Sequence, residues 1–231
     1  MATQITWYGH NAWQIEMAGK TVLVDPFLDD SPTAPVKSDE VRADFILLSH
    51  GHGDHVGDTI KIAKRTGATV LSNFEVGEWL KARGVAEDKV IGMNPGGGVP
   101  TAFGHAKFTI AHHSSSMPDG SYGGVPGGWL LTLGKERVYF ACDTALFLDM
   151  KLIGSGGLDL AVLPIGDRFT MGPDDSLDAI KLLSPKRVAP CHYNTWPPIE
   201  QDARAWAERV RSHTAAEPIV LEPGEKFRLG T

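Results

Sequence analysis

The sequence predicts an α/β protein in which two mixed β-sheets pack face to face with helices outside them, an αββα sandwich. Short apolar segments that resemble strands alternate with helical segments along the chain. Each half of the chain carries its own strands and helices, which favours two sheets over one. No linker, low-complexity tract or short repeat interrupts this pattern. With 231 residues the chain can bury a large core, so we expect one domain, 1–231.

The first half opens with three short strands, and Ala18-Gly19-Lys20 forms the hairpin turn between the second and the third. A polar segment with two prolines, 31–40, predicts a loop. Gly67 and Gly84 end the two helices of this half, since glycine readily adopts the conformation that follows a helix. The expected strands are 5–7, 12–17, 21–25, 45–49, 69–72 and 90–91, and the expected helices are 58–65 and 74–82.

The second half repeats this alternation after a segment rich in glycine and proline. Residues 94–101 hold three consecutive glycines and two prolines, which predicts a turn or loop. Apolar runs then recur up to the end of the chain. The expected strands are 108–111, 129–133, 138–143, 160–164, 187–190, 219–221 and 227–229, and the expected helices are 175–183 and 200–211.

The run HGHGDH at 50–55 is the strongest chemical signal in the sequence. It places four potential metal ligands, His50, His52, Asp54 and His55, directly after the apolar strand 45–49. Neutral imidazole and carboxylate groups suit zinc and related divalent metals. The glycines between them allow the backbone to turn sharply enough for the side chains to converge. The run therefore predicts a metal site at a sheet edge.

Three further ligand residues each follow an apolar run. His113 follows the strand 108–111, Asp143 ends the strand 138–143, and His192 follows the strand 187–190. Side chains that come from the ends of different strands can meet at one edge of the fold. We therefore expect these three residues to join the 50–55 motif in a single site.

This ordered set of ligands resembles that of the metallo-β-lactamase superfamily. Further motifs resemble a branch of small metal-dependent hydrolases related to the ascorbate-6-phosphate lactonases, and the matches extend from residue 5 to about 200. The motifs of this branch are TWYGH at 6–10, VDPF at 24–27, AHHSS at 111–115, PIG at 164–166, FTMG at 169–172 and HYNTWPP at 192–198.

The resemblance implies the metallo-β-lactamase fold and a dinuclear centre. It assigns His50, His52 and His113 to one metal ion and Asp54, His55 and His192 to the other, with Asp143 bridging the two. We expect two divalent ions per chain, zinc or manganese, with iron as a further option, because such ligand sets serve all three metals. Ions roughly 3.5–4 Å apart can share a hydroxide of lowered pKa.

The expected activity is that of a metal-dependent hydrolase, in which the bridging hydroxide cleaves a small lactone, ester or phosphodiester. Asp143 bridges the ions, and Asp54 also orients the nucleophile. Two alternatives stay open: a nuclease-type phosphodiesterase, and a redox or non-catalytic member of the same fold. The net charge of −6 disfavours a polyanionic partner. Redox di-iron relatives have a glutamate between the motif histidines, where this chain has Gly51.

Six residues outside this ligand set are weaker candidates. His10 either lines the site or is a structural histidine, and Asp25 either hydrogen-bonds a ligand histidine or forms a turn. Ser114 begins a Gly/Ser-rich stretch, 114–128, that is either a pocket wall or a flexible connector. Arg168 either recognises a substrate carboxylate or phosphate or pairs with a nearby acid. Tyr193 and Asn194 either donate to a substrate oxyanion or fix their loop.

Composition points to a cytoplasmic protein with a small-molecule substrate. No segment approaches the roughly 20 apolar residues of a membrane span, and the first residues do not resemble a signal peptide. The two cysteines, Cys142 and Cys191, each precede a proposed ligand and should face the core as reduced thiols. We expect neither a membrane nor a nucleic-acid partner, and assembly into a homo-oligomer stays open.

Overall fold

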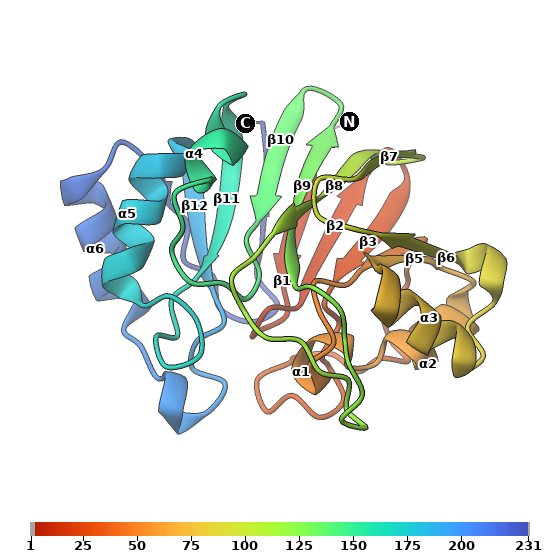
Figure 1. Ribbon diagram of the computed structural model, residues 1–231. Coiled ribbons are helices and arrows are strands. Elements are labelled where there is room, and N and C mark those ends of the chain that lie inside the picture. The colour runs from red at the N-terminus through yellow and green to blue at the C-terminus, as the bar shows by residue number, and fades with distance from the viewer. Residues whose placement is uncertain (1–2, 231) are drawn as a thin grey trace.

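The computed structural model describes residues 3–230 and contains two packed seven-stranded sheets, as the sequence predicts (Figure 1). The first sheet consists mainly of the first half of the chain. Its strands, in spatial order, are β14 (Lys226–Arg228), β1 (Gln4–Trp7), β2 (Trp13–Met17), β3 (Lys20–Val24), β4 (Phe45–Leu47), β5 (Thr69–Asn73) and β6 (Val90–Met93). β1 to β3 form an antiparallel meander, and β3 to β6 run parallel.

The second sheet is built from the middle and the end of the chain. β7 to β10 are antiparallel, and β10 to β13 run parallel. Its strands, in spatial order, are β13 (Glu217–Pro218), β12 (Pro185–Cys191), β11 (Leu158–Pro164), β10 (Glu136–Phe140), β9 (Gly127–Leu133), β8 (Gly104–Ile110) and β7 (Gly98–Thr101).

Helices cover the outer face of each sheet. In Figure 1, α2 and α3 lie on the flank of β4 to β6, and α4, α5 and α6 lie on the flank of β11 and β12. The helices are α1 (Gly53–Val56), α2 (Thr59–Thr66), α3 (Phe74–Ala82), α4 (Met150–Gly154), α5 (Pro173–Leu183) and α6 (Ala203–His213), with short 3-10 turns at Glu87–Lys89 and Pro197–Ile199. None of these helices is long and apolar enough to cross a membrane.

The alternation of side chains along a strand produces two hydrophobic cores. On β3, Val22 and Val24 point into the core between the two sheets, where they join Trp13, Trp129 and other large side chains. Leu23, between them, points to the other face and packs in a second core under α2 and α3. The first sheet is thus apolar on both faces, which fixes it between the second sheet and its own helices.

Four details of the secondary structure differ from the sequence-based prediction. Residues 98–101, expected in a loop, form β7, because this strand lies at the sheet edge where glycine and proline are tolerated. The expected strand 219–221 is wrong, since the pairing occurs at Glu217–Pro218. The helices α1 and α4 are absent from the sequence-based prediction. Both helices span only four or five residues, too few for a helical period to be visible.

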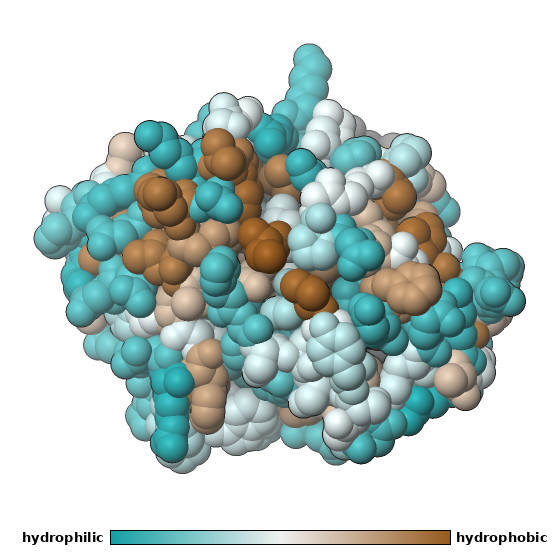
Figure 2. All heavy atoms as spheres, viewed as in Figure 1, coloured by the Kyte–Doolittle hydropathy of each residue, from teal (hydrophilic) through white to brown (hydrophobic). Residues whose placement is uncertain are grey.

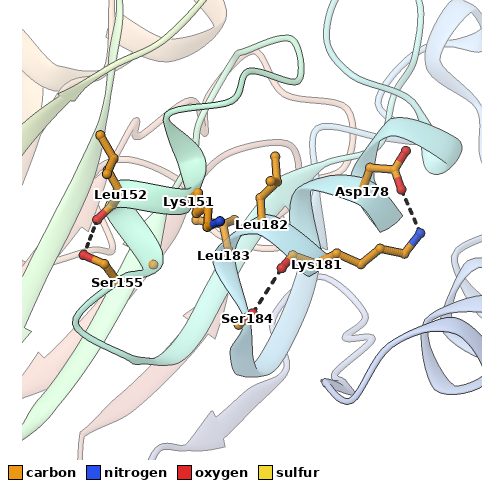
Figure 3. A pocket seen from close by; sticks show the side chains of 9 residues that line it. Lys151, Leu152, Ser155, Asp178, Lys181, Leu182, Leu183 and Ser184 are labelled. Atoms are coloured by element: carbon orange, nitrogen blue, oxygen red, sulfur yellow. Dashed lines mark hydrogen bonds and ion pairs between the residues drawn. The ribbon is translucent and has the colours of Figure 1, made fainter.

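Apolar side chains are exposed near α4. Leu148, Leu152 and Phe169 are all more than half exposed, and Figure 2 shows apolar residues gathered over the region of α4 and α5. A groove of about 670 Å³ lies between these helices. Two of its three charged residues, Asp178 and Lys181, pair with one another, and Lys151 is the third (Figure 3). The groove contains none of the predicted ligands and is separate from the site described below.

Candidate metal centre

The seven predicted ligands come from both sheets and meet at one edge of the sandwich. His50 to His55 follow β4 and run into α1, at the lower edge in Figure 1. His113, Asp143 and His192 follow the ends of β8, β10 and β12 in the other sheet. The topology therefore brings residues from the ends of strands in both sheets to one edge, with Asp54 and His55 in α1.

Left-handed backbone at this edge turns several side chains toward the site. Asp25, Cys142 and His192 have φ values of 42°, 53° and 53°, and His10 has φ 50°. Each of these residues lies at or just beyond the end of a strand. Non-glycine residues avoid this conformation unless their surroundings hold them in it, and such residues concentrate at functional sites.

The first group of ligand side chains consists of His50, His52 and His113, with one nitrogen from each within 4.8 Å of the others. His50 Nε2 lies 2.8 Å from His52 Nδ1. His50 is buried, whereas His52 and His113 are partly exposed. The group is therefore open to solvent on the side of His52 and His113.

The second group consists of Asp54, His55 and His192, together with His10. Asp54 Oδ2 lies 3.0 Å from His10 Nε2, 3.8 Å from His55 Nε2 and 4.0 Å from His192 Nε2. His10, His55 and His192 are buried, and the Asp54 side chain is 28% exposed. Asp54 is thus the member of this group that a substrate can reach.

Asp143 lies between the two groups. Its Oδ2 atom is 3.0 Å from His192 Nε2, 3.3 Å from His55 Nε2 and 3.5 Å from His113 Nε2. It also shares a possible ligand set with His50 and His55. One carboxylate therefore faces histidines of both groups, as the expected bridging role requires.

Asp25 lies directly behind the motif. Its Oδ2 atom is 2.8 Å from His55 Nδ1 and accepts hydrogen bonds from Asn11 Nδ2 and Ser49 Oγ, while Oδ1 accepts from the Ser49 amide. Asp25 is fully buried. A carboxylate that accepts from His55 Nδ1–H leaves Nε2 as the free nitrogen facing Asp143. This geometry agrees with the predicted contact between Asp25 and a ligand histidine.

Burial and neighbouring charges set the protonation of the site. Burial lowers the pKa values of His50, His52 and His113, which keeps these imidazoles neutral and able to bind a metal. Burial and the nearby His192 lower the pKa of His10 to about 4. Burial also opposes the charged form of His55, but Asp143, Asp54 and Asp25 outweigh it and raise its pKa well above the usual range.

Both carboxylates of the site favour the ionised form. Burial acts against ionisation of Asp54, but His55 and His10 outweigh it and lower its pKa. Burial likewise opposes the charge on Asp143. The nearby His192 and His55 outweigh this effect and hold the pKa of Asp143 well below its usual range. Ionised carboxylates beside the neutral imidazoles of His50, His52 and His113 form the donor set that divalent metals prefer.

Several buried polar atoms at this centre have no hydrogen-bond partner among the described residues. They are His55 Nε2, His192 Nδ1 and Nε2, and Asp143 Oδ1. An unpaired buried polar atom costs about 1–3 kcal/mol, so such atoms are rare without a ligand to bind. The donor set therefore fits divalent metal ions.

The Gly/Ser-rich stretch packs against the 50–55 motif through residues other than Ser114. Ser114 is exposed, whereas the Ser115 hydroxyl accepts from the Gly51 amide and donates to the Gly123 carbonyl. Met117 is buried near Gly51. The stretch is also tied to α3, because Asn73 Nδ2 donates to the Gly123 and Val125 carbonyls. It is therefore an anchored wall beside the motif and not a loose connector.

Of the remaining candidates, Arg168 lies on the surface, whereas Tyr193 and Asn194 contact other residues of the chain. Arg168 is exposed, stacks over Phe169 and forms no ion pair within residues 3–230, so the alternative of pairing with an acid is wrong. The Tyr193 ring is buried and stacks on Trp7 at 5.3 Å. Asn194 accepts from the Gln201 amide through Oδ1. For Tyr193 and Asn194, these contacts favour the loop-fixing alternative.

Sequence reasoning missed four residues that support the site. Ser49 and Asn11 hold Asp25, Ser115 holds Gly51, and the Thr195 hydroxyl lies 2.7 Å from His10 Nδ1. Thr195 belongs to the HYNTWPP motif, which was the one available signal for it. The others are common polar residues, and only the folded structure brings them to the residues they hold. Cys142 and Cys191 are buried free thiols, as expected.

Comparison with known proteins gives consistent matches across the chain. Residues 20–193 match the family model described as "Beta-lactamase superfamily domain". A UPF0173 metal-dependent hydrolase of Thermus thermophilus is 48% identical over 226 residues, which cover 98% of this chain and 99% of that protein. A UPF0173 metal-dependent hydrolase of Bacillus cytotoxicus is 47% identical over 232 residues, with 98% and 100% covered.

A solved structure agrees with this grouping. The metallo hydrolase Igni18 of Ignicoccus hospitalis superposes with a TM-score of 0.90 at 34% sequence identity, and the match covers 100% of both chains.

Proposed function

Since this chain belongs to the β-lactamase superfamily, among its UPF0173 metal-dependent hydrolases, we propose that it is a dinuclear hydrolase of a small lactone, ester or phosphodiester. The observation that carries the proposal is the position of Asp143 Oδ2, within 3.5 Å of Nε2 atoms of His113, His55 and His192. A carboxylate between two groups of nitrogen ligands suits a bridge between two ions.

The proposed first metal position is formed by His50, His52 and His113, and the second by Asp54, His55 and His192. When bound, two divalent ions supply Lewis acidity and lower the pKa of a bound water toward neutrality. Zinc or manganese fits the donor set, and iron is a further option. The partly exposed Asp54 accepts a proton or hydrogen bond from the attacking water and so orients it toward the substrate.

The loops around the centre favour a small substrate. The anchored stretch 114–128 borders the motif on one side, and the 166–172 turn exposes residues 167–169, including Arg168. Arg168 has no acidic partner in the described chain and is free to contact a substrate carboxylate or phosphate. The acidic net charge of −6 disfavours a nucleic-acid substrate. We propose a cytoplasmic enzyme without a membrane partner.

Two experiments test this proposal. Elemental analysis of protein purified without chelator should give two divalent ions per chain, and fewer than two after reconstitution would contradict a dinuclear centre. A panel of lactones, esters and phosphodiesters then identifies a substrate. In water enriched in oxygen-18, the label should enter the product within a single turnover, because no serine or cysteine lies in a nucleophile elbow. A trapped acyl- or phosphoryl-enzyme would exclude direct attack by water.

A further inference from the structure

We propose that His10 is a positioning residue that holds the Asp54 carboxylate, and that the Thr195 hydroxyl fixes the tautomer in which His10 does so. The inference rests on the proposed dinuclear centre and assigns a role to two residues outside its ligand set. Its structural basis is a continuous chain of contacts: Thr195 Oγ1 lies 2.7 Å from His10 Nδ1, and His10 Nε2 lies 3.0 Å from Asp54 Oδ2.

The direction of the hydrogen bonds follows from the chemistry of the groups. An ionised carboxylate can only accept, so the proton between His10 and Asp54 belongs to His10 Nε2. In neutral His10 the other nitrogen, Nδ1, is then an acceptor. The Thr195 hydroxyl can donate to it, and a hydroxyl is one of the few side-chain groups that can do so from this position. Thr195 therefore selects the tautomer that directs an N–H at Asp54.

His10 itself is held in place on every side. It is fully buried, and its ring lies 4.1 Å from the ring of His192 and 5.0 Å from that of Trp196. Its backbone carbonyl accepts hydrogen bonds from the His192 amide and from Trp7 Nε1. The backbone of His10 is thus tied to that of a proposed ligand, and the packed rings of His192 and Trp196 restrict rotation of the imidazole away from Asp54.

The Asp54 carboxylate depends on His10 for its orientation. The Asp54 side chain is partly exposed, and among the described residues His10 is the hydrogen-bond partner of its carboxylate. Without His10, Oδ2 would be free to rotate toward solvent. With Nε2 protonated, His10 has no lone pair to offer a metal, although its nitrogen lies within reach of the second group. Positioning and ligation are therefore separable roles.

Stepwise Co²⁺ titration of the metal-stripped full chain tests the inference. We expect Thr195→Val to weaken binding of the second Co²⁺ by about 10- to 100-fold, the usual effect of removing a group that orients a ligand. It should change the visible spectrum of that ion and leave the first ion unaffected. Thr195→Ser keeps the hydroxyl and should restore both properties. His10→Gln, which keeps an N–H donor, should bind the second ion more tightly than His10→Phe.

A matched control is Thr59→Val, which removes a buried hydroxyl without a hydrogen-bond partner at the first residue of α2, outside the proposed ligand set. It should bind Co²⁺ as the wild type does. Circular dichroism of every variant identifies loss of fold, and where Thr195→Val fails to fold, the order of His10→Gln and His10→Phe decides.

The outcomes separate this inference from the proposed function. Wild-type protein that binds fewer than two Co²⁺ per chain overturns the dinuclear centre and the inference with it. Two ions bound equally well by the wild type, Thr195→Val and His10→Phe overturn the inference alone. A crystal structure of the loaded wild type with His10 Nε2 at the bonding distance of about 2.0–2.1 Å from an ion would show ligation and also overturn it.

Discussion

Of the two glycines in the 50–55 motif, Gly51 has less room around it. A Cβ atom at this position would lie 2.6 Å from Met117 Sδ and 3.1 Å from the Ser116 carbonyl oxygen. At Gly53 a Cβ atom would meet nothing closer than Pro118 Cγ at 3.9 Å. The two glycines of the motif thus differ in role: Gly51 permits close packing of the 114–128 stretch, whereas Gly53 begins α1.

This difference predicts unequal effects of adding a methyl group. Gly51→Ala should lower the free energy of unfolding by about 1–3 kcal/mol, the usual cost of overpacking, and should weaken metal binding at His50 and His52. Gly53→Ala should be nearly neutral because its methyl group has space. Urea unfolding and metal content of the two variants measure this. Equal stability of both would show that Met117 and Ser116 move aside freely.

Substitution of Asp54 should reduce turnover without unfolding the protein. Asp54→Asn keeps the shape of the side chain and an oxygen that can bind a metal, but it removes the negative charge that orients the attacking water. We expect a folded protein that retains at least one ion and loses about 10²-fold or more in turnover. Turnover and metal content must be measured on the same sample. Near-wild-type turnover with full metal would restrict Asp54 to a structural role.

Among the secondary-structure elements, α6 has the clearest N-terminal cap. The Asp202 side chain accepts hydrogen bonds from the Arg204 and Ala205 amides. Asp149 occupies the corresponding position before α4 but forms no such bond. α6 packs Trp206 and Val210 into the core, so its first turn supports the outer layer of the second sheet.

Asp202→Ala should therefore destabilise the protein by about 1 kcal/mol, within the range known for lost caps. Asp149→Ala is the matched control and should change stability little, since no capping bond is lost. Thermal or urea unfolding of both variants at fixed metal concentration gives the comparison. A larger loss for Asp149→Ala would show that the capping hydrogen bonds of Asp202 do not determine stability here.

The secondary-structure elements also differ in how well the sequence predicts them. The proposed ligands follow β4, β8, β10 and β12, and the apolar runs of these strands indicate their ends well enough to predict one site at a single edge. β7 was missed because a glycine- and proline-rich strand is recognisable only once its neighbour β8 pairs with it. The ligands share a local motif or an apolar context. By contrast, Thr195 and Ser115 fall within the HYNTWPP and AHHSS motifs, but the motifs do not indicate the distant residues that the two side chains contact.

At the scale of the whole molecule, the proposed metal ligands connect the two sheets. His50 and His55 follow a strand of the first sheet, and Asp143 and His192 follow strands of the second. A metal ion that binds only the folded protein raises the free energy of unfolding, and the increase grows with the logarithm of the ratio of metal concentration to Kd. The ions therefore add to the hydrophobic core that already joins the sheets.

Removal of the metal should lower the melting temperature by roughly 5–10 °C. This follows from about 2.7 kcal/mol at a hundredfold excess of metal over Kd and about 2–4 °C per kcal/mol for a chain of this size. Calorimetry with and without a chelator measures the shift, and His113→Ala should reduce it. An identical melting temperature in both conditions would mean that the ions bind the unfolded chain as well or do not bind.

The division of ligands between the sheets also sets an order of events during synthesis. The four residues of the 50–55 motif leave the ribosome well before His113, Asp143 and His192, and β14 pairs with β1 only when residues 226–228 have been made. A nascent chain that ends after β6 contains only part of each ligand group, because His113, Asp143 and His192 have not yet been made. We therefore expect the metals to enter late, when nearly the whole chain has emerged, so that shortened products of interrupted translation do not sequester them.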